Sequence, residues 1–157
     1  MHVSSAIRYC GSSKERKPMA AVHTIDAVWA KLVAAHLRTE GLPVDQILGR
    51  AGINPRVLNQ KNARILFRQH AALLDLAAEA TGDGCFGLNL SAQEVEIRDA
   101  GLLAYVGLSS KTLGEAIRNL ARYLGVLNEA ARINLELSRE LAVLGLDIAD
   151  PTVRSRR

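Results

Sequence analysis

LLDLAAEATGDGCFGLNL, residues 73–90, contains the end of one expected helix and the start of the next apolar segment. Gly82 fits the left-handed position that ends many helices, and Asp83 is suited to cap the helix that follows. Cys85 is interpreted as a small buried or half-buried packing residue. We therefore predict a structural junction between two groups of helices, pinned to the core by the apolar side chains of Phe86, Leu88 and Leu90.

Two longer helices are expected before this junction, because apolar residues recur there at helical spacing. The first covers residues 25–40, with Thr24 as its N-cap and Gly41 at its end. The second covers residues 63–81 and buries a stripe of Leu66, Phe67, His70, Leu73, Leu74, Ala77 and Ala78. His70 is interpreted as a histidine at the edge of the core that makes one hydrogen bond.

The segment between these helices, VDQILGRAGINPRVLNQK at residues 44–61, has two interpretations. Pro43 and Asn54-Pro55 favour two short helices separated by Gly52 within a helical domain. The alternative is a DNA-binding helix-turn-helix whose second helix presents Arg56, Asn59, Gln60 and Lys61 to base edges. The bulky Leu48, where such motifs place a small residue, and Pro55, which shortens the second helix, favour the first interpretation.

After the junction, residues 91–98 are expected to form a polar linker. Asp99 is suited to cap a helix over residues 101–108, and Thr112 with Glu115 forms a capping box for the next helix. That helix is expected to end near residue 128 and to turn these residues inward: Leu113, Ala116, Ile117, Leu120 and Leu124. From Ala131 the apolar period becomes two, which predicts a β-hairpin with strands 131–137 and 141–148 and a turn at 138–140.

Together these patterns predict an α+β fold that is predominantly helical, with about six helices followed by a C-terminal β-hairpin. A lone hairpin is marginal in water, so it is expected to lie on the helices or to join strands outside this chain. The 157 residues are enough for one domain, which we place at 19–150. Residues 1–18 are expected to be a disordered extension and residues 151–157 a basic tail, and Met19 is a second candidate start besides Met1.

The net charge of +4 is located mainly at the two ends of the chain. Residues 1–17 hold four basic side chains against one acidic, and residues 151–157 hold three arginines, so the body is slightly acidic. A nucleic-acid-binding domain usually carries a basic face, which the composition of the body does not favour. Solvated tails are the preferred interpretation of this basicity.

Motifs that would indicate catalysis or a metal site do not occur in the sequence. There is no glycine-rich phosphate loop, CxxC, HExxH or Gly-x-Ser-x-Gly. Glu94 and Glu96 are the nearest carboxylate pair and are expected in a solvated loop, and Cys85 has no histidine at a recognisable spacing. Two cysteines are also too few for a disulfide scaffold. We expect no catalytic residue, no metal and no cofactor.

The order of these pieces resembles a known family. LGRAGI, AALLDLAAEATGDGCFGLNL, DAGLLAYVGLSSKTLGEAIRNLARYL and INLEL follow one another as in the N-terminal arabinose-binding-like effector domain of AraC-type transcriptional regulators. The resemblance covers residues 24–148. It is carried by Ala78, Thr81, Gly82, Asp83, Phe86, Gly87, Leu88, Gly101, Leu102, Tyr105, Ser109, Ser110, Thr112, Leu113, Ala116, Leu120, Tyr123 and Leu124.

This resemblance implies a sensory domain that binds a small-molecule effector or a regulatory partner. A cytoplasmic location is expected because the chain has only two cysteines. In the family it controls a C-terminal DNA-binding domain of two helix-turn-helix units, so we expect a truncated regulator that does not itself bind operator DNA. The expected protein partner is a second copy or a full-length paralogous regulator, with no membrane involved. A fragment, a gene remnant and a stand-alone module stay open, as do the effector, its contact residues and the oligomeric state.

Overall fold

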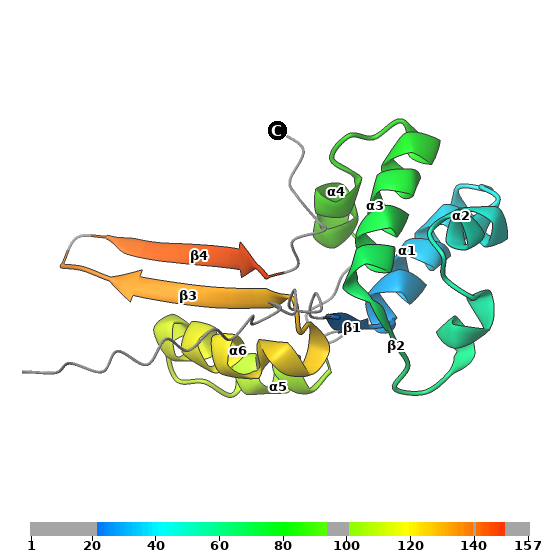
Figure 1. The fold of residues 1–157 in the computed structure, drawn as a ribbon. Helices are drawn as coiled ribbons and strands as arrows, with labels where there is room; N and C mark the ends of the chain where they lie inside the picture. Colours follow the sequence, from blue (N-terminus) through cyan, green and yellow to red (C-terminus); the bar gives the residue numbers. More distant parts are fainter. Residues whose placement is uncertain (1–21, 94–100, 140, 150–157) are drawn as a thin grey trace, which may run out of the picture.

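The computed structural model describes residues 22–93, 101–139 and 141–149 (Figure 1). Within these ranges six α-helices and a C-terminal hairpin confirm the expected fold class. Residues 22–93, the helical half, hold β1 (Thr24–Asp26), α1 (Val28–Thr39), α2 (Val44–Arg50), the 3₁₀ helix η1 (Pro55–Asn59), β2 (Arg64–Leu66), α3 (Phe67–Thr81) and α4 (Phe86–Gln93). The remainder, the hairpin half, holds α5 (Leu102–Leu108), α6 (Leu113–Leu127), β3 (Ala131–Leu137) and β4 (Ala142–Ile148).

The core of the protein lies mainly in the helical half, where α1 packs against α2 and α3. Small side chains on α1 and α3, such as Ala30, Ala34 and Ala77, are fully buried and let the helices approach closely. Leu37, Leu48 and Leu73 fill the space between them and are also inaccessible to solvent. The aliphatic, alanine-rich composition is thus used in close helix packing.

Both longer helices of this half begin three to four residues later than expected, because a short two-stranded sheet precedes them. Thr24, expected to be an N-cap, instead pairs with Leu66 in the antiparallel β1–β2 ladder. The backbone N–H of Val28 is taken up by Asp26 Oδ1 at 2.8 Å, so Asp26 supports the start of α1. The strands are separated by about forty residues, and local periodicity does not reveal such a pairing.

The 73–90 junction has the expected backbone, with two differences in its side chains. Gly82 adopts φ 71°, and Asp83 Oδ1 accepts the Cys85 N–H at 2.8 Å, as predicted. Phe86 is buried and meets the His36 ring edge-on at 5.5 Å. Leu88 is 72% exposed and Cys85 is exposed, so their expected burial was wrong. The segment is helical, and helical spacing places Phe86 and Leu90 on one face and Leu88 on the other.

The hairpin half has the expected hairpin, whose return strand begins at Ala142. Ile133 pairs with Leu146 and Leu135 with Leu144 in the ladder, and β3 lies alongside α6 (Figure 1). Thr112 Oγ1 accepts the Glu115 N–H at 3.2 Å, which is half of the expected capping box. The Glu115 carboxylate accepts the Lys111 N–H instead of that of Thr112.

The inward face of α6 is less buried than expected. Ala116, Ile117, Leu120 and Leu124 are only half-buried, and Leu113 is 77% exposed. Of the expected 91–98 linker, residues 91–93 belong to α4. The rest of that linker, with Glu94 and Glu96, and the cap Asp99 lie outside the described residues, as do residues 1–21 and 150–157. None of the described helices is both long and apolar enough to cross a membrane.

Candidate functional site

A groove of about 600 Å³ lies where the two halves meet. The helical half contributes Ile25 of β1, Trp29 of α1 and His70 of α3. The hairpin half contributes side chains of α5 and α6, together with Ile133 and Leu146 of the hairpin. Because both halves form its walls, the shape of the groove depends on their relative position (Figure 1).

The groove is mostly apolar. Its polar side chains in the described part of the chain are His70, Ser91 and Asn128, and none of its described lining residues is charged. Ser91 Oγ already donates to the Gly87 carbonyl at 2.7 Å, and Asn128 Oδ1 already accepts the Ala130 N–H at 3.0 Å. The hydrogen-bonding groups left for a bound molecule are few, namely the Asn128 amide N–H groups, the Trp29 indole N–H and the imidazole of His70.

His70 is the unusual polar group of this groove. Its Nδ1 is buried and has no hydrogen-bond partner among the described residues, so the single hydrogen bond expected for this residue is absent at that nitrogen. Burial lowers the pKa of His70 to about 4, because the charged imidazolium would lose its hydration. The ring is therefore neutral at neutral pH. Buried polar atoms normally have a partner, and this one is an exception beside the groove.

A polar latch joins the two halves next to the groove. The Glu129 carboxylate accepts the Thr24 N–H at 2.8 Å and the Thr24 hydroxyl at 2.9 Å, and these bonds lower its pKa. Arg64 donates to the Thr24 hydroxyl at 2.7 Å and to the Val126 carbonyl at 2.6 Å, and pairs with Glu129 at 3.4 Å. A backbone bridge between Ile25 and Asn128 adds to this connection.

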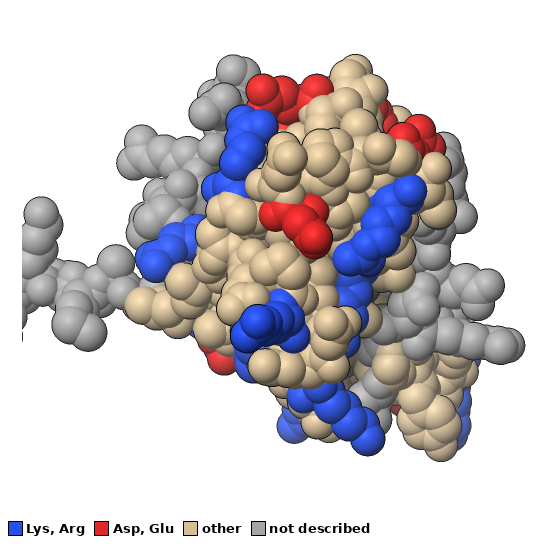
Figure 2. All heavy atoms as spheres, turned by 90° about the vertical axis from the view of Figure 1, so that its right-hand side faces the viewer, with Lys and Arg blue, Asp and Glu red and all other residues tan. Residues whose placement is uncertain are grey.

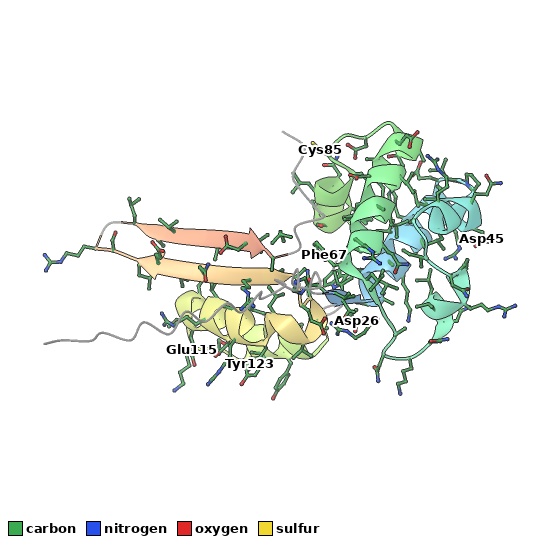
Figure 3. The ribbon with its side chains drawn as sticks, in the orientation of Figure 1. Asp26, Asp45, Phe67, Cys85, Glu115 and Tyr123 are labelled. Carbon is green, nitrogen blue, oxygen red and sulfur yellow. The ribbon has the colours of Figure 1, made fainter. Side chains whose placement is uncertain are left out.

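The other side chains that drew attention in the sequence lie apart from the groove. Figure 3 shows Cys85 at the α3–α4 turn and Tyr123 on α6, with its side chain directed away from the hairpin. Tyr105 on α5 is 72% exposed. No group of three or more His, Cys, Asp or Glu side chains suited to a metal ion occurs within residues 22–93, 101–139 and 141–149. The candidate site is therefore one for binding, formed by the two halves together.

Comparison with known proteins gives a family match over most of the chain. A family model described as the arabinose-binding domain of AraC transcription regulators, N-terminal, matches residues 41–157. The chain belongs to this family. This confirms the resemblance and assigns the chain to a regulatory, non-enzymatic domain.

A curated relative of this AraC-type domain is the ornithine utilization regulator of Pseudomonas aeruginosa. The two are 32% identical over 97 residues, which is 62% of this chain and 28% of that protein. The chain therefore matches little more than a quarter of the length of this relative.

The 44–61 segment of the AraC-type domain forms α2 and η1, and all of it lies within the family match. Asn54 Oδ1 accepts the Arg56 N–H at 3.0 Å, so the expected cap is confirmed. Arg56 and Asn59 are exposed and border a second hollow of about 370 Å³ together with Lys31, Arg38 and Asp45. Figure 2 shows this face of the molecule with acidic side chains among the basic ones.

Sequence reasoning did not find the groove. Leu120 and Leu124 were expected to be core residues because their spacing is that of a buried helix face. They line a partly open space because the hairpin half covers only part of that surface. One signal was present in the sequence, namely a histidine within an otherwise apolar stripe on α3, at His70.

Proposed function

We propose that this AraC-type domain senses a small molecule that binds in the groove between its halves. The observation that carries the proposal is the apolar groove of about 600 Å³ beside the partnerless Nδ1 of His70. Ligand sites are typically concave, mostly apolar and about 300–1,000 Å³ in volume, with a few polar groups that orient the ligand. The family description supports a ligand-binding role.

The groove also provides a route from binding to regulation. A molecule that contacts both walls favours the arrangement of the halves in which those contacts are best, and so shifts the equilibrium between arrangements. The latch of Arg64, Glu129 and Thr24 spans the same boundary and sets the arrangement in the absence of ligand. In this proposal the response is passed in the cytoplasm to a second copy or to a full-length paralogous regulator.

We further propose that residues 19–150 act without binding operator DNA themselves. The alternative is DNA binding through the pair around residues 44–61. A recognition helix must lie in the major groove and present several side chains to base edges. η1 is a 3₁₀ helix of five residues and starts at Pro55, which leaves little helix for this purpose. The mixed charge around Arg56 and Asp45 also disfavours a phosphate-binding face (Figure 2).

A thermal-shift screen of small metabolites tests the sensing proposal. A true effector raises the melting temperature of the wild-type chain in proportion to the logarithm of its concentration. The matched control is Gly107→Leu, which adds a side chain at a lining position of α5, where a Cβ meets only Leu120 at an ordinary distance of 3.8 Å. A shift of equal size in this variant would show that the ligand binds elsewhere.

Fluorescence anisotropy with labelled DNA, measured over a range of salt concentrations, tests the DNA-binding alternative. We expect weak binding that disappears when Arg154, Arg156 and Arg157 are replaced by alanine, since the basicity lies in the tails. Tight, sequence-selective binding that is lost in Arg56→Ala would instead establish the 44–61 segment as a DNA reader.

A further inference from the structure

The polar groups available in the groove restrict the kind of molecule that fits it. Ser91 Oγ and Asn128 Oδ1 already have partners within the protein, which leaves the Asn128 amide N–H groups and the Trp29 indole N–H as donors beside His70. The imidazole of His70 has an unsatisfied nitrogen, and as a neutral ring it provides one donor and one acceptor. A half-turn of the ring about Cβ–Cγ exchanges Nδ1 with Cδ2, and such terminal torsions are broad. The ring itself borders the groove.

None of the described lining residues is charged, which disfavours the binding of ions. A carboxylate or ammonium group that leaves water needs an opposite charge or several hydrogen bonds, and the described lining residues offer no opposite charge. A molecule with many hydroxyl groups is disfavoured for the same reason, because most of its hydroxyls would have no partner. The apolar walls, among them Trp29, Leu124 and Ile133, instead match an apolar body.

We infer that the groove takes an uncharged, largely apolar molecule with few hydrogen-bonding groups, one of which pairs with the imidazole of His70. The inference rests on the proposed sensing function and names the ligand class for that groove. This ligand class differs from those suggested by the names of the family and of the ornithine utilization regulator, since ornithine is charged and arabinose is rich in hydroxyl groups.

The chain contains its own reporter for this test. Trp29 is the single tryptophan and lines the groove, so its fluorescence responds to occupancy at that place. The probes are 1-octanol, octanoate, L-ornithine and L-arabinose, each titrated at neutral pH into the full chain. 1-Octanol and octanoate have chains of equal length and differ in charge, which isolates the effect of the charge.

Three variants locate the binding. Ser91→Leu and Gly107→Leu each add bulk to the groove from a different helix, and Ser91 is exposed, so its replacement leaves the core intact. His70→Leu keeps an apolar wall but removes the hydrogen-bonding ring. Leu141→Ala is the matched control, because Leu141 is 70% exposed and lies outside the groove.

We expect saturable binding of 1-octanol, with octanoate weaker by about tenfold or more because its charge has no partner. His70→Leu should weaken 1-octanol by about 2- to 10-fold, the usual contribution of one hydrogen bond. Ser91→Leu and Gly107→Leu should lose the fluorescence response to 1-octanol, and Leu141→Ala should keep it.

Several results would overturn the inference. Octanoate, ornithine or arabinose binding more tightly than 1-octanol would refute the ligand class, while their binding at Trp29 would uphold the sensing function. An unchanged response to 1-octanol in both Ser91→Leu and Gly107→Leu would show that 1-octanol binds nonspecifically to exposed apolar surface and not in the groove. No response to any probe would also refute the class, and the metabolite screen would then decide the sensing function separately.

Discussion

Replacing His70 by leucine is expected to remove much of the acid sensitivity of the fold. The imidazole borders the groove with its Nδ1 buried and without a partner, and burial lowers its pKa to about 4. In the unfolded chain the same ring has an ordinary pKa near 6.5. Between these two values the unfolded state binds a proton that the folded state rejects, so the free energy of unfolding falls as the pH falls.

The size of this effect follows from the difference between the two pKa values. From the shift of His70 to about 4, linkage gives a loss of roughly 2 kcal/mol on going from about pH 7 to about pH 5. The full loss, roughly 3 kcal/mol, is reached only below the folded pKa. Above about pH 7 both states are neutral and the ring makes no pH-dependent contribution. The buried Nδ1 also lacks a partner, so His70→Leu should be no less stable than the wild type at neutral pH.

Urea unfolding followed by circular dichroism at several pH values between about 7 and 5 measures this difference. Carboxylates such as Glu129 also lose stability in acid, but they do so equally in both proteins, so the difference between them isolates His70. Parallel pH profiles for wild type and His70→Leu would refute the reasoning, because they would show that the ring is protonated as readily in the folded protein as in the unfolded chain.

Three further substitutions test the fold, each by urea unfolding. Phe86→Ala should lower the free energy of unfolding by about 3–5 kcal/mol because the ring is buried. Leu88→Ala, at a 72% exposed position, should lower it little, and equal effects would mean that Phe86 does not hold the junction to the core. Gly82→Ala should cost about 1 kcal/mol through its φ of 71°, and Gly84→Ala serves as the comparison without a positive φ; equal stabilities would contradict this. Arg64→Ala should cost about 1 kcal/mol and increase proteolysis between the halves; unchanged cleavage would show that the latch does not hold them.

Much of the fold could be read from local signals in the sequence. The C-terminal end of α3 follows from Gly82, and the start of η1 follows from Asn54-Pro55. Both signals act on residues within one turn of the helix. The hairpin follows from the change to a period of two at Ala131. The same local reasoning placed Leu88 and Leu113 in the core incorrectly. An apolar residue is buried only where another element covers it, and the residue's own spacing does not show whether that element is present.

The candidate site could not be read in this way, because its walls come from segments far apart in the chain. Ile25, His70 and Leu146 meet only after the two halves are placed side by side. The latch likewise joins Thr24 to Glu129, more than one hundred residues away. His70 was recognisable as a histidine on an apolar stripe, but its missing partner became visible only with the surrounding atoms in place.

The sequence by itself determined the helical class, the junction at residues 73–90, the hairpin and, through many ordered positions, the AraC-type family. Caps, periods and turn residues act over a few positions, so they are present in the order of the amino acids. Tertiary structure alone decided the β1–β2 pairing, the latch and the apolar groove with its neutral histidine. These features depend on contacts across long sequence separations and on how completely one half covers the other.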